Sequence, residues 1–334
     1  MENPTKNQHF ISQSEQRSNC IDDNTSKHKK RIYKFSIVDR EDHTIRLVKE
    51  EGVKIKNNLS FFDLFSFDVT DNPIRKNLES FFQKYEADLD VCSRTLVSEV
   101  RDNAAVSIVT DLAAKFLKAK IMGIVRNPFC IASTLNMFQG LARVSPTDPQ
   151  LLSVFKSIRN GAKPHAEKVC LEFGVSSKQY LDWLSVIFLA LMIPPGSGVS
   201  VLESLVDGLI ASPGKMCHLI LATFEDIEGS RVALPDTGYL QGTEDPHHNM
   251  FMFNVNKNAF ASFSFVDLEK QTIVRVPDVL RERIGVLGLG FSFQCHHNVL
   301  QLLKVFNALA VYQSTRHVFC ADKSIYGVTT LPSH

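Results

Sequence analysis

The sequence predicts an α+β fold, a central helical block with a mainly antiparallel C-terminal sheet. Apolar residues recur at three- and four-residue steps over about 72–212, whereas short β-type runs divided by Gly, Pro, Asn and Asp follow residue 213. Helices in one block and strands in another favour α+β over an alternating parallel-sheet fold. We expect a docked N-terminal strip and linker over 1–31, a mainly helical region over 32–212, and a β-rich region with a closing helix over 213–334. The last two regions are expected to form one compact unit.

The composition excludes several classes of protein. The chain has 334 residues, with 37 Lys+Arg against 36 Asp+Glu, so any anion binding has to come from a local patch. Seven cysteines at irregular spacings, without Cys-x-x-Cys, indicate reduced thiols rather than disulfides or a zinc ribbon. The polar N-terminus lacks an apolar signal core, and the longest apolar run, 183–193, is too short for a membrane span. We therefore expect a cytoplasmic protein with no membrane segment.

The first elements follow from local patterns. Phe10 and Ile11 give the polar strip 7–17 an apolar anchor, which predicts that it is ordered. The basic run 27–31 predicts an exposed linker. The β-formers on either side of the turn-prone residues 39–42 predict a hairpin over 32–37 and 44–48.

Helix signals begin at Asn72, a good N-cap followed by Pro73, which places the start of a long amphipathic helix there. Ser176 with Gln179 three residues later has the spacing of a capping box. Further helices are expected over 105–123, 132–143, 149–158 and 201–210. The strands are expected over 216–224, 231–234, 249–254, 261–265 and 271–276, before a closing helix over 298–312 and a strand over 317–319.

Common catalytic signatures are missing from the sequence. It contains no Gly-rich phosphate loop with a following Lys, no Gly-x-Gly-x-x-Gly, no Gly-x-Ser-x-Gly and no His-Glu-x-x-His. The His/Cys clusters at 247–248 and 295–297 have adjacent residues, whereas zinc ligands are usually two to four residues apart, so structural or surface roles are favoured. We assign no metal ligand and leave a divalent metal cofactor open.

Three polar islands remain as candidate site residues. The strip 7–17 contains Gln8, His9 and Gln13; a predicted helix ends at Arg126, where Pro128 forces the exit. A third island, 233–239, is a strand that runs into an acidic turn at Asp236, and strand ends often present side chains to a cleft.

These islands resemble a bacterial family of uncharacterised proteins with an N-terminal His-x-x-Pro-x-x-Tyr-Leu, a central Arg-Thr-Pro and a later Thr-Ser-Asp-Asn-Pro. The matching positions in this chain are His9, Arg126, Pro128, Asp236, Asn307 and Arg316. The chain resembles a divergent member, since Ser12 stands where the family has Pro, and Pro235 where it has Ser. The resemblance implies a cytoplasmic effector of the antiviral-defence or toxin type, without implying a reaction.

The chemistry of these residues suits phosphodiester cleavage. His9 can act as a general acid or base, Asp236 can orient it or hold a metal, and Arg126 can pair with a phosphate. No activated Ser or Cys is evident, which disfavours acyl transfer. We therefore predict a phosphodiesterase or nuclease that acts on nucleic acid. The additional binding residues are expected to be Gln8, Gln13, Asn307 and Arg316. A partner protein or a homo-oligomer is left open.

Two alternatives stay open. In the first, the same residues are structural: His9 docks the N-terminus, Arg126 caps helix carbonyls and Asp236 stabilises a turn. In the second, the chain is a non-catalytic sensor or regulatory binding protein.

Overall fold

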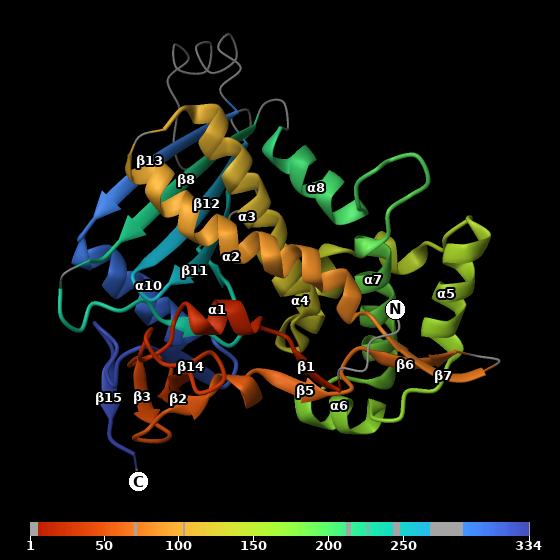
Figure 1. The fold of residues 1–334 in the computed structure, drawn as a ribbon, viewed down its shortest axis with the longest axis horizontal. Helices are drawn as coiled ribbons and strands as arrows, with labels where there is room; N and C mark the ends of the chain where they lie inside the picture. The colour runs from red at the N-terminus through yellow and green to blue at the C-terminus, as the bar shows by residue number, and fades with distance from the viewer. Residues whose placement is uncertain are drawn as a thin grey trace.

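A computed structural model describes residues 6–69, 72–102, 104–211, 215–225, 227–242, 248–267 and 290–333. The expected α+β class is confirmed (Figure 1). The helices are α1 (Gln13–Arg17), α2 (Glu79–Arg101), α3 (Val106–Arg126), α4 (Ile131–Met137), α5 (Pro149–Asn160), α6 (Ala166–Phe173), α7 (Ser177–Leu191), α8 (Val201–Ile210) and α10 (Leu300–Gln313). No helix in these ranges is both long enough and apolar enough to cross a bilayer.

The two longest helices, α2 and α3, cover one face of a mixed sheet. Its strand order is β10 (Leu240–Gln241), β11 (His248–Asn256), β12 (Ala259–Asp267), β8 (Lys215–Thr223) and β13 (Phe291–His297). On the α2–α3 face, Phe116 of α3 stacks on Phe263 at 6.1 Å between ring centroids. On the opposite face, Phe306 of α10 stacks on Phe260 at 4.4 Å. Alternate residues of β12 thus anchor the two helix layers that Figure 1 shows on either side of the sheet.

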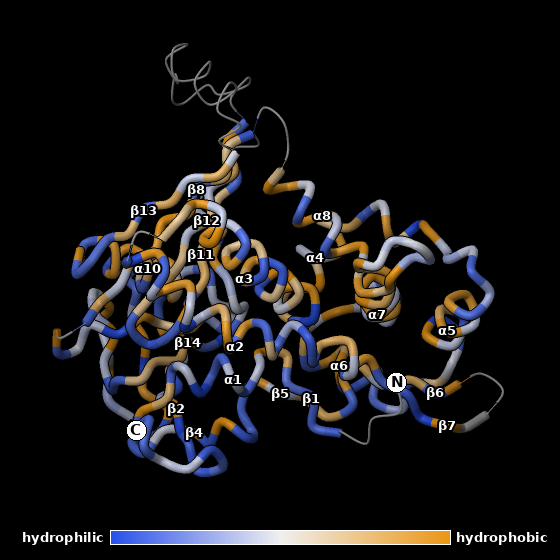
Figure 2. Tube along the Cα trace, turned by 45° about the horizontal axis from the view of Figure 1, so that its top comes forward, coloured by the Kyte–Doolittle hydropathy of each residue, from blue (hydrophilic) through white to orange (hydrophobic). Residues whose placement is uncertain are grey.

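A second sheet unites the N-terminal hairpin with the end of the chain. Its order is β15 (Thr329–Leu331), β3 (Thr44–Leu47), β2 (Arg31–Asp39), β14 (His317–Cys320) and β9 (Leu234–Pro235), and β4 (Val53–Lys54) also pairs with β2. The predicted hairpin is confirmed as β2 and β3. Figure 2 shows this sheet below the main one, at the end where the C-terminus lies.

Two short strand pairs connect the N-terminal strip with the start of α2. They are β1 (Asn7–His9) with β5 (Ser60–Phe62), and β6 (Ser66–Val69) with β7 (Asn72–Asn77). The predicted helix start at Asn72 is therefore wrong, because 72–77 pairs with β6 and α2 begins at Glu79. A proline near the start of an edge strand is tolerated as well as one in a first helical turn, so Asn72–Pro73 fits both structures.

Other predicted elements differ in detail. The capping box at Ser176 and Gln179 is present. Of the strand expected over 231–234 only Leu234 is in a strand, because the backbone N–H of Ala233 donates to Asn307 instead of to a neighbouring strand. The strand expected over 271–276 lies outside the described residues. In the basic linker, residues 27–29 are exposed, but Lys30 and Arg31 are half-buried and bonded to backbone carbonyls, so the linker ends before β2.

Candidate functional site

Strand β1 directs its polar side chains to opposite sides, one toward the protein interior and two toward a surface pocket. Successive residues of a strand point to opposite sides, so Asn7 and His9 face one way and Gln8 the other. Gln8 is fully buried, where its Oε1 accepts the backbone N–H of Phe65 at 2.6 Å and its Nε2 donates to Ser66 at 3.2 Å. Gln8 therefore fixes the strand, whereas Asn7 and His9 line a surface pocket.

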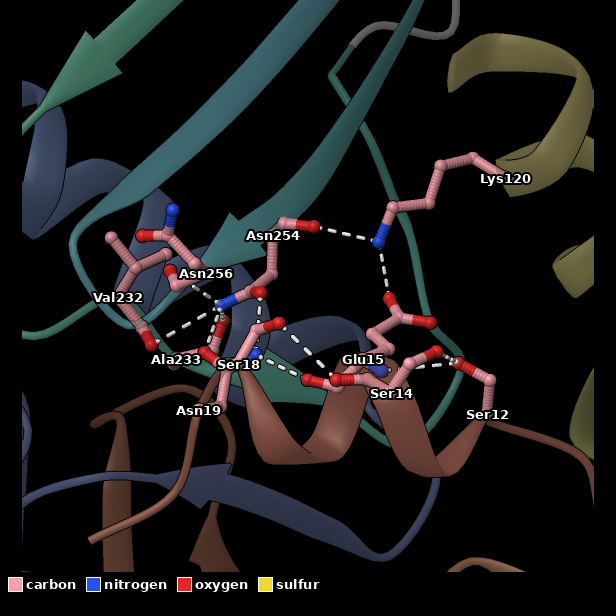
Figure 3. A network of polar contacts seen from close by, with 10 residues as sticks. All are labelled: Ser12, Ser14, Glu15, Ser18, Asn19, Lys120, Val232, Ala233, Asn254 and Asn256. Carbon is pink, nitrogen blue, oxygen red and sulfur yellow. Dashed lines mark hydrogen bonds and ion pairs between the residues drawn. The ribbon is translucent and has the colours of Figure 1, made fainter. Parts of the chain in front are cut away.

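Helix α1 is held in place by a buried cation (Figure 3). Lys120 of α3 is 3% exposed and pairs with Glu15 of α1, while its Nζ donates to the carbonyl of Asn254 at 2.6 Å. The amides of Asn19 and Asn254 donate to each other at 2.8 and 2.9 Å. The network joins three distant segments of the chain and leaves the other face of α1 free for the pocket. As predicted, Phe10 anchors the N-terminal strip: it is buried, with its ring edge-to-face with that of Phe129 at 5.7 Å.

Loss of the buried cation should loosen the N-terminal segment. We expect Lys120→Met to lower the free energy of unfolding by about 3–5 kcal/mol, because Glu15 would stay buried without its cation. Lys118 on the same helix pairs with Asp207, whose side chain is half-exposed, so Lys118→Met should cost less than about 1 kcal/mol. Urea denaturation of both variants measures the difference, and equal losses would contradict the role given to Lys120.

The start of α2 supplies two acidic side chains to the same pocket. Glu79 and Glu86 are seven residues apart, two helical turns, and so lie on one face of α2 together with the buried Phe82. The side chain of Asn77 accepts the backbone N–H of Glu79 at 3.1 Å and fixes the first turn. The face that buries Phe82 against the core therefore also carries both carboxylates.

Arg126 is the last residue of α3 and lies behind the wall of the pocket. It is 2% exposed, its Nη1 donates to Glu86 at 2.7 Å, and its guanidinium lies 5.2 Å from the centre of the Phe82 ring. The helix ends there as predicted, since Pro128 opens a 3-10 turn, Pro128–Cys130. A buried guanidinium at a helix C-terminus is favoured by the helix dipole and brings fixed positive charge to the pocket.

The pocket has a volume of about 310 Å³. It is lined by Asn7, His9, Gln13, Ser14, Arg17, Lys27, Glu79 and Glu86. Within the described residues, two residues of the lining have a buried side-chain atom without a hydrogen-bond partner, His9 Nε2 and Glu79 Oε1, and Arg126 Nε behind the wall is a third such atom. Buried polar atoms are nearly always paired, so such a group of unpaired atoms points to a ligand.

The environment of the pocket favours the uncharged forms of Glu79 and His9. Burial raises the pKa of Glu79 to about 7, with Glu86 adding to the rise and Arg126 opposing it. Burial also lowers the pKa of His9, and Arg126 lowers it further, whereas the backbone carbonyls of Ile55 and Lys56 and the charge of Glu86 oppose the fall. At neutral pH the site therefore holds an uncharged imidazole beside a carboxyl group that is close to half-protonated.

The structure does not bring Asp236 to this pocket. Asp236 is fully buried, and its carboxylate accepts the backbone N–H groups of Thr315, Arg316 and His317 at 2.7, 2.7 and 2.8 Å. The expected triad of His9, Arg126 and Asp236 is therefore reduced to its first two members. Asp236 instead ties β9 to β14.

The remaining candidate binding residues lie in different places. Gln13 lines the pocket, where its Oε1 accepts from Arg17 at 3.1 Å. Asn307 is buried in α10 and bonds to the backbone of Ala233, Arg231 and Tyr326. The side chain of Arg316 pairs with Glu172 and lies over the ring of Phe129 at 5.5 Å.

Comparison with protein-family models, curated proteins and solved structures finds no match. The pocket is therefore interpreted from its own geometry. In the ranges that the structure describes, no group of three or more His, Cys, Asp or Glu side chains has the arrangement of a metal site. Of the His/Cys clusters, His297 lies at the edge strand β13 and bonds to Thr223 at 3.1 Å, while His247 lies outside the described residues.

Other hollows lack this concentration of unpaired groups. One of about 530 Å³ is lined by Glu225, Arg231 and neighbouring residues, and an apolar groove of about 540 Å³ lies between α4, α8 and the edge of the main sheet. None of the described residues that line them carries a buried polar atom without a partner. The pocket of His9 and Glu79 is therefore the stronger candidate.

Glu79, Glu86 and Arg17 are not among the site residues that the sequence predicts. One signal was present: Glu79 and Glu86 occupy steps of three and four residues along the same face as Phe82 and Leu89, both of which are buried. Two carboxylates on an otherwise apolar face of a helix are costly unless they are paired or functional. The misplaced helix start concealed this pattern.

Proposed function

We propose that this chain is a phosphodiesterase or nuclease, with His9 and Glu79 as its proton-transferring pair. The observation that carries the proposal is that His9 and Glu79 line one pocket and that each has a buried side-chain atom without a hydrogen-bond partner, with the buried Arg126 paired to Glu86 of the same lining. A neutral imidazole held by backbone carbonyls donates from one nitrogen and leaves the other as an acceptor, so His9 is the general base. Glu79, close to half-protonated at neutral pH, is the general acid.

The charges of the pocket suit an anionic substrate. Arg17 and Lys27 line its rim, and Arg126 lies behind it, paired with Glu86. Because Glu79 carries about half a charge at neutral pH, the three cations outweigh the acidic groups that line the pocket. A guanidinium matches the oxygens of a phosphate, so Arg17 is assigned to hold the scissile group and Arg126 to supply a fixed positive potential.

The proposed roles predict a large effect of a change at His9. We expect His9→Asn to reduce kcat/KM on a nucleic acid substrate by about 10²–10⁴-fold, the usual contribution of a general base. The melting temperature should change little, because Asn keeps an N–H donor for the nearby carbonyls. The exposed His28 gives a matched control, and His28→Asn should leave both quantities unchanged.

The same variant distinguishes a nuclease from a non-catalytic sensor. If the protein is a sensor, the wild-type chain should bind nucleic acid and show no turnover at any concentration. The variant His9→Asn should then change only the dissociation constant. The family resemblance of the N-terminal motif extends the proposal to an antiviral-defence or toxin-like effector. Expression of the wild type and of His9→Asn in a bacterial host challenged with phage tests that extension.

A further inference from the structure

The groove that carries the site is longer than a single phosphate requires. The pocket of His9 and Glu79 adjoins a second hollow of about 390 Å³ along α2, lined at its far end by Gln83, Ala87 and Asp90. The two hollows share the lining residues Ser14, Arg17, Lys27 and Glu86. Together they form one groove with two compartments, each in the size range of a small-ligand site.

Cations lie at the junction of the two compartments. Arg17 is half-buried and oriented by its bond to Gln13, while Lys27 is exposed at the rim. The phosphate that joins two nucleotides would lie between these side chains if one nucleotide occupied each compartment. The groove therefore suits a polynucleotide chain better than a mononucleotide.

The chemical groups of the groove lack an activated nucleophile. The lining supplies a proton acceptor, His9, and a proton donor, Glu79, but its one hydroxyl, Ser14, is hydrogen-bonded to Ser12 at 3.0 Å. The attacking oxygen must then come from solvent or from the substrate. RNA carries such an oxygen beside every phosphate, and a reaction within one molecule has an effective concentration of about 10⁵–10⁸ M.

We infer that the substrate of this groove is RNA, cleaved by attack of its own 2′-hydroxyl, an inference that rests on the proposed function. His9 Nε2 takes the proton of the 2′-hydroxyl as the bond from O2′ to phosphorus forms. The bond from phosphorus to O5′ breaks, and Glu79 gives its proton to the departing O5′. The products are a 2′,3′-cyclic phosphate and a free 5′-hydroxyl, with no net gain or loss of protons.

Oligonucleotides of defined sugar composition test the inference with the full chain. The set is an all-RNA strand, an all-DNA strand, a DNA strand with one ribonucleotide, and the same strand with a 2′-O-methyl group at that position. We expect cleavage of the first, cleavage of the third only on the 3′ side of its ribonucleotide, and no cleavage of the other two. Mass spectrometry should find the cyclic phosphate.

Each contrary outcome has a separate meaning. Cleavage of all-DNA at a rate similar to RNA, or products with 5′-phosphates, would overturn the RNA inference and leave the proposed nuclease intact. Cleavage of none of the strands would overturn both.

Binding at the junction gives a second, independent measurement. On the uncleavable 2′-O-methyl RNA, Lys27→Ala should weaken affinity and reduce the slope of log K against log salt by about 0.7, the value for one phosphate contact on a single strand. Lys29 is exposed on the same loop and does not line the groove, so Lys29→Ala is the control. Equal slopes for the two variants would show that the RNA does not pass the junction.

Discussion

Replacement of Glu79 by glutamine is expected to slow cleavage strongly and to make the protein more stable above neutral pH. Gln cannot give up a proton to the leaving oxygen, so kcat/KM should fall by about 10²–10⁴-fold. In the wild type, kcat/KM should follow a bell-shaped pH profile, rising as His9 loses its proton and falling as Glu79 loses its own at about pH 7. The residual activity of the variant should lack the falling limb.

The stability effect has a definite sign. The pKa of Glu79 is about 7 in the folded chain against an ordinary value of 4.5, so the unfolded chain releases this proton first as the pH rises. The wild type therefore loses stability between about pH 4.5 and 7, an amount of about 3 kcal/mol, and Glu79→Gln avoids the loss. Burial is the main cause of the raised pKa of Glu79, which the charge of Arg126 opposes and the charge of Glu86 increases.

Denaturant unfolding at pH 5 and pH 8 measures this difference directly. The free energy of unfolding of Glu79→Gln should exceed that of the wild type at pH 8 and come close to it at pH 5. The exposed Glu41 serves as the control, since Glu41→Gln should have the same small effect at both pH values. A variant that is less stable than the wild type at pH 8 would show that the Glu79 carboxylate has a partner in the folded chain.

The effects of Asp236→Asn should be opposite to those of Glu79→Gln: the protein should lose stability and keep its activity. Its carboxylate accepts three backbone N–H groups, and an amide has one oxygen to offer and places an NH₂ group against the others. Each buried donor left without an acceptor costs about 1–3 kcal/mol, so we expect a loss of about 3–5 kcal/mol. At a temperature where the variant is folded, its kcat/KM should equal that of the wild type.

A thermal melt and a cleavage assay on the same preparation separate the two roles of Asp236. The exposed Asp42 offers a comparison, and Asp42→Asn should change the melting temperature by no more than experimental error. Lost activity with an unchanged melting temperature would return Asp236 to the catalytic role that its strand-end position suggests.

The sequence predicted the parts of this molecule that depend on local patterns. The hairpin of β2 and β3, the end of α3 at Arg126 and the capping box of α7 each follow from turn chemistry or from periodicity. His9 and Arg126 were singled out as candidates, because a His in an ordered polar strip and an Arg at a helix end are unusual locally. Parallel pairing of β13 with β8 depends on distant residues and left no comparable pattern.

The distinction between Asp236 and Glu79 could not be read from the sequence. Both are acidic residues at the end of a regular element, and both are buried or half-buried. They differ in whether neighbouring backbone N–H groups use up their oxygens, and those neighbours are residues 315–317 for Asp236. Such hydrogen-bond accounting requires the three-dimensional structure.

The network of Glu15, Asn19, Lys120 and Asn254 that holds α1 joins segments that are synthesised at different times. Asn19 and Asn254, which bond to each other, are 235 residues apart in the sequence, and Lys120 needs Asn254 as well as Glu15. Contacts of such long range form late, after the local helices. A nascent chain still on the ribosome therefore lacks the residue that seats α1 until strand β11 has emerged. The groove of His9 and Glu79 is therefore complete only after most of the protein has been synthesised.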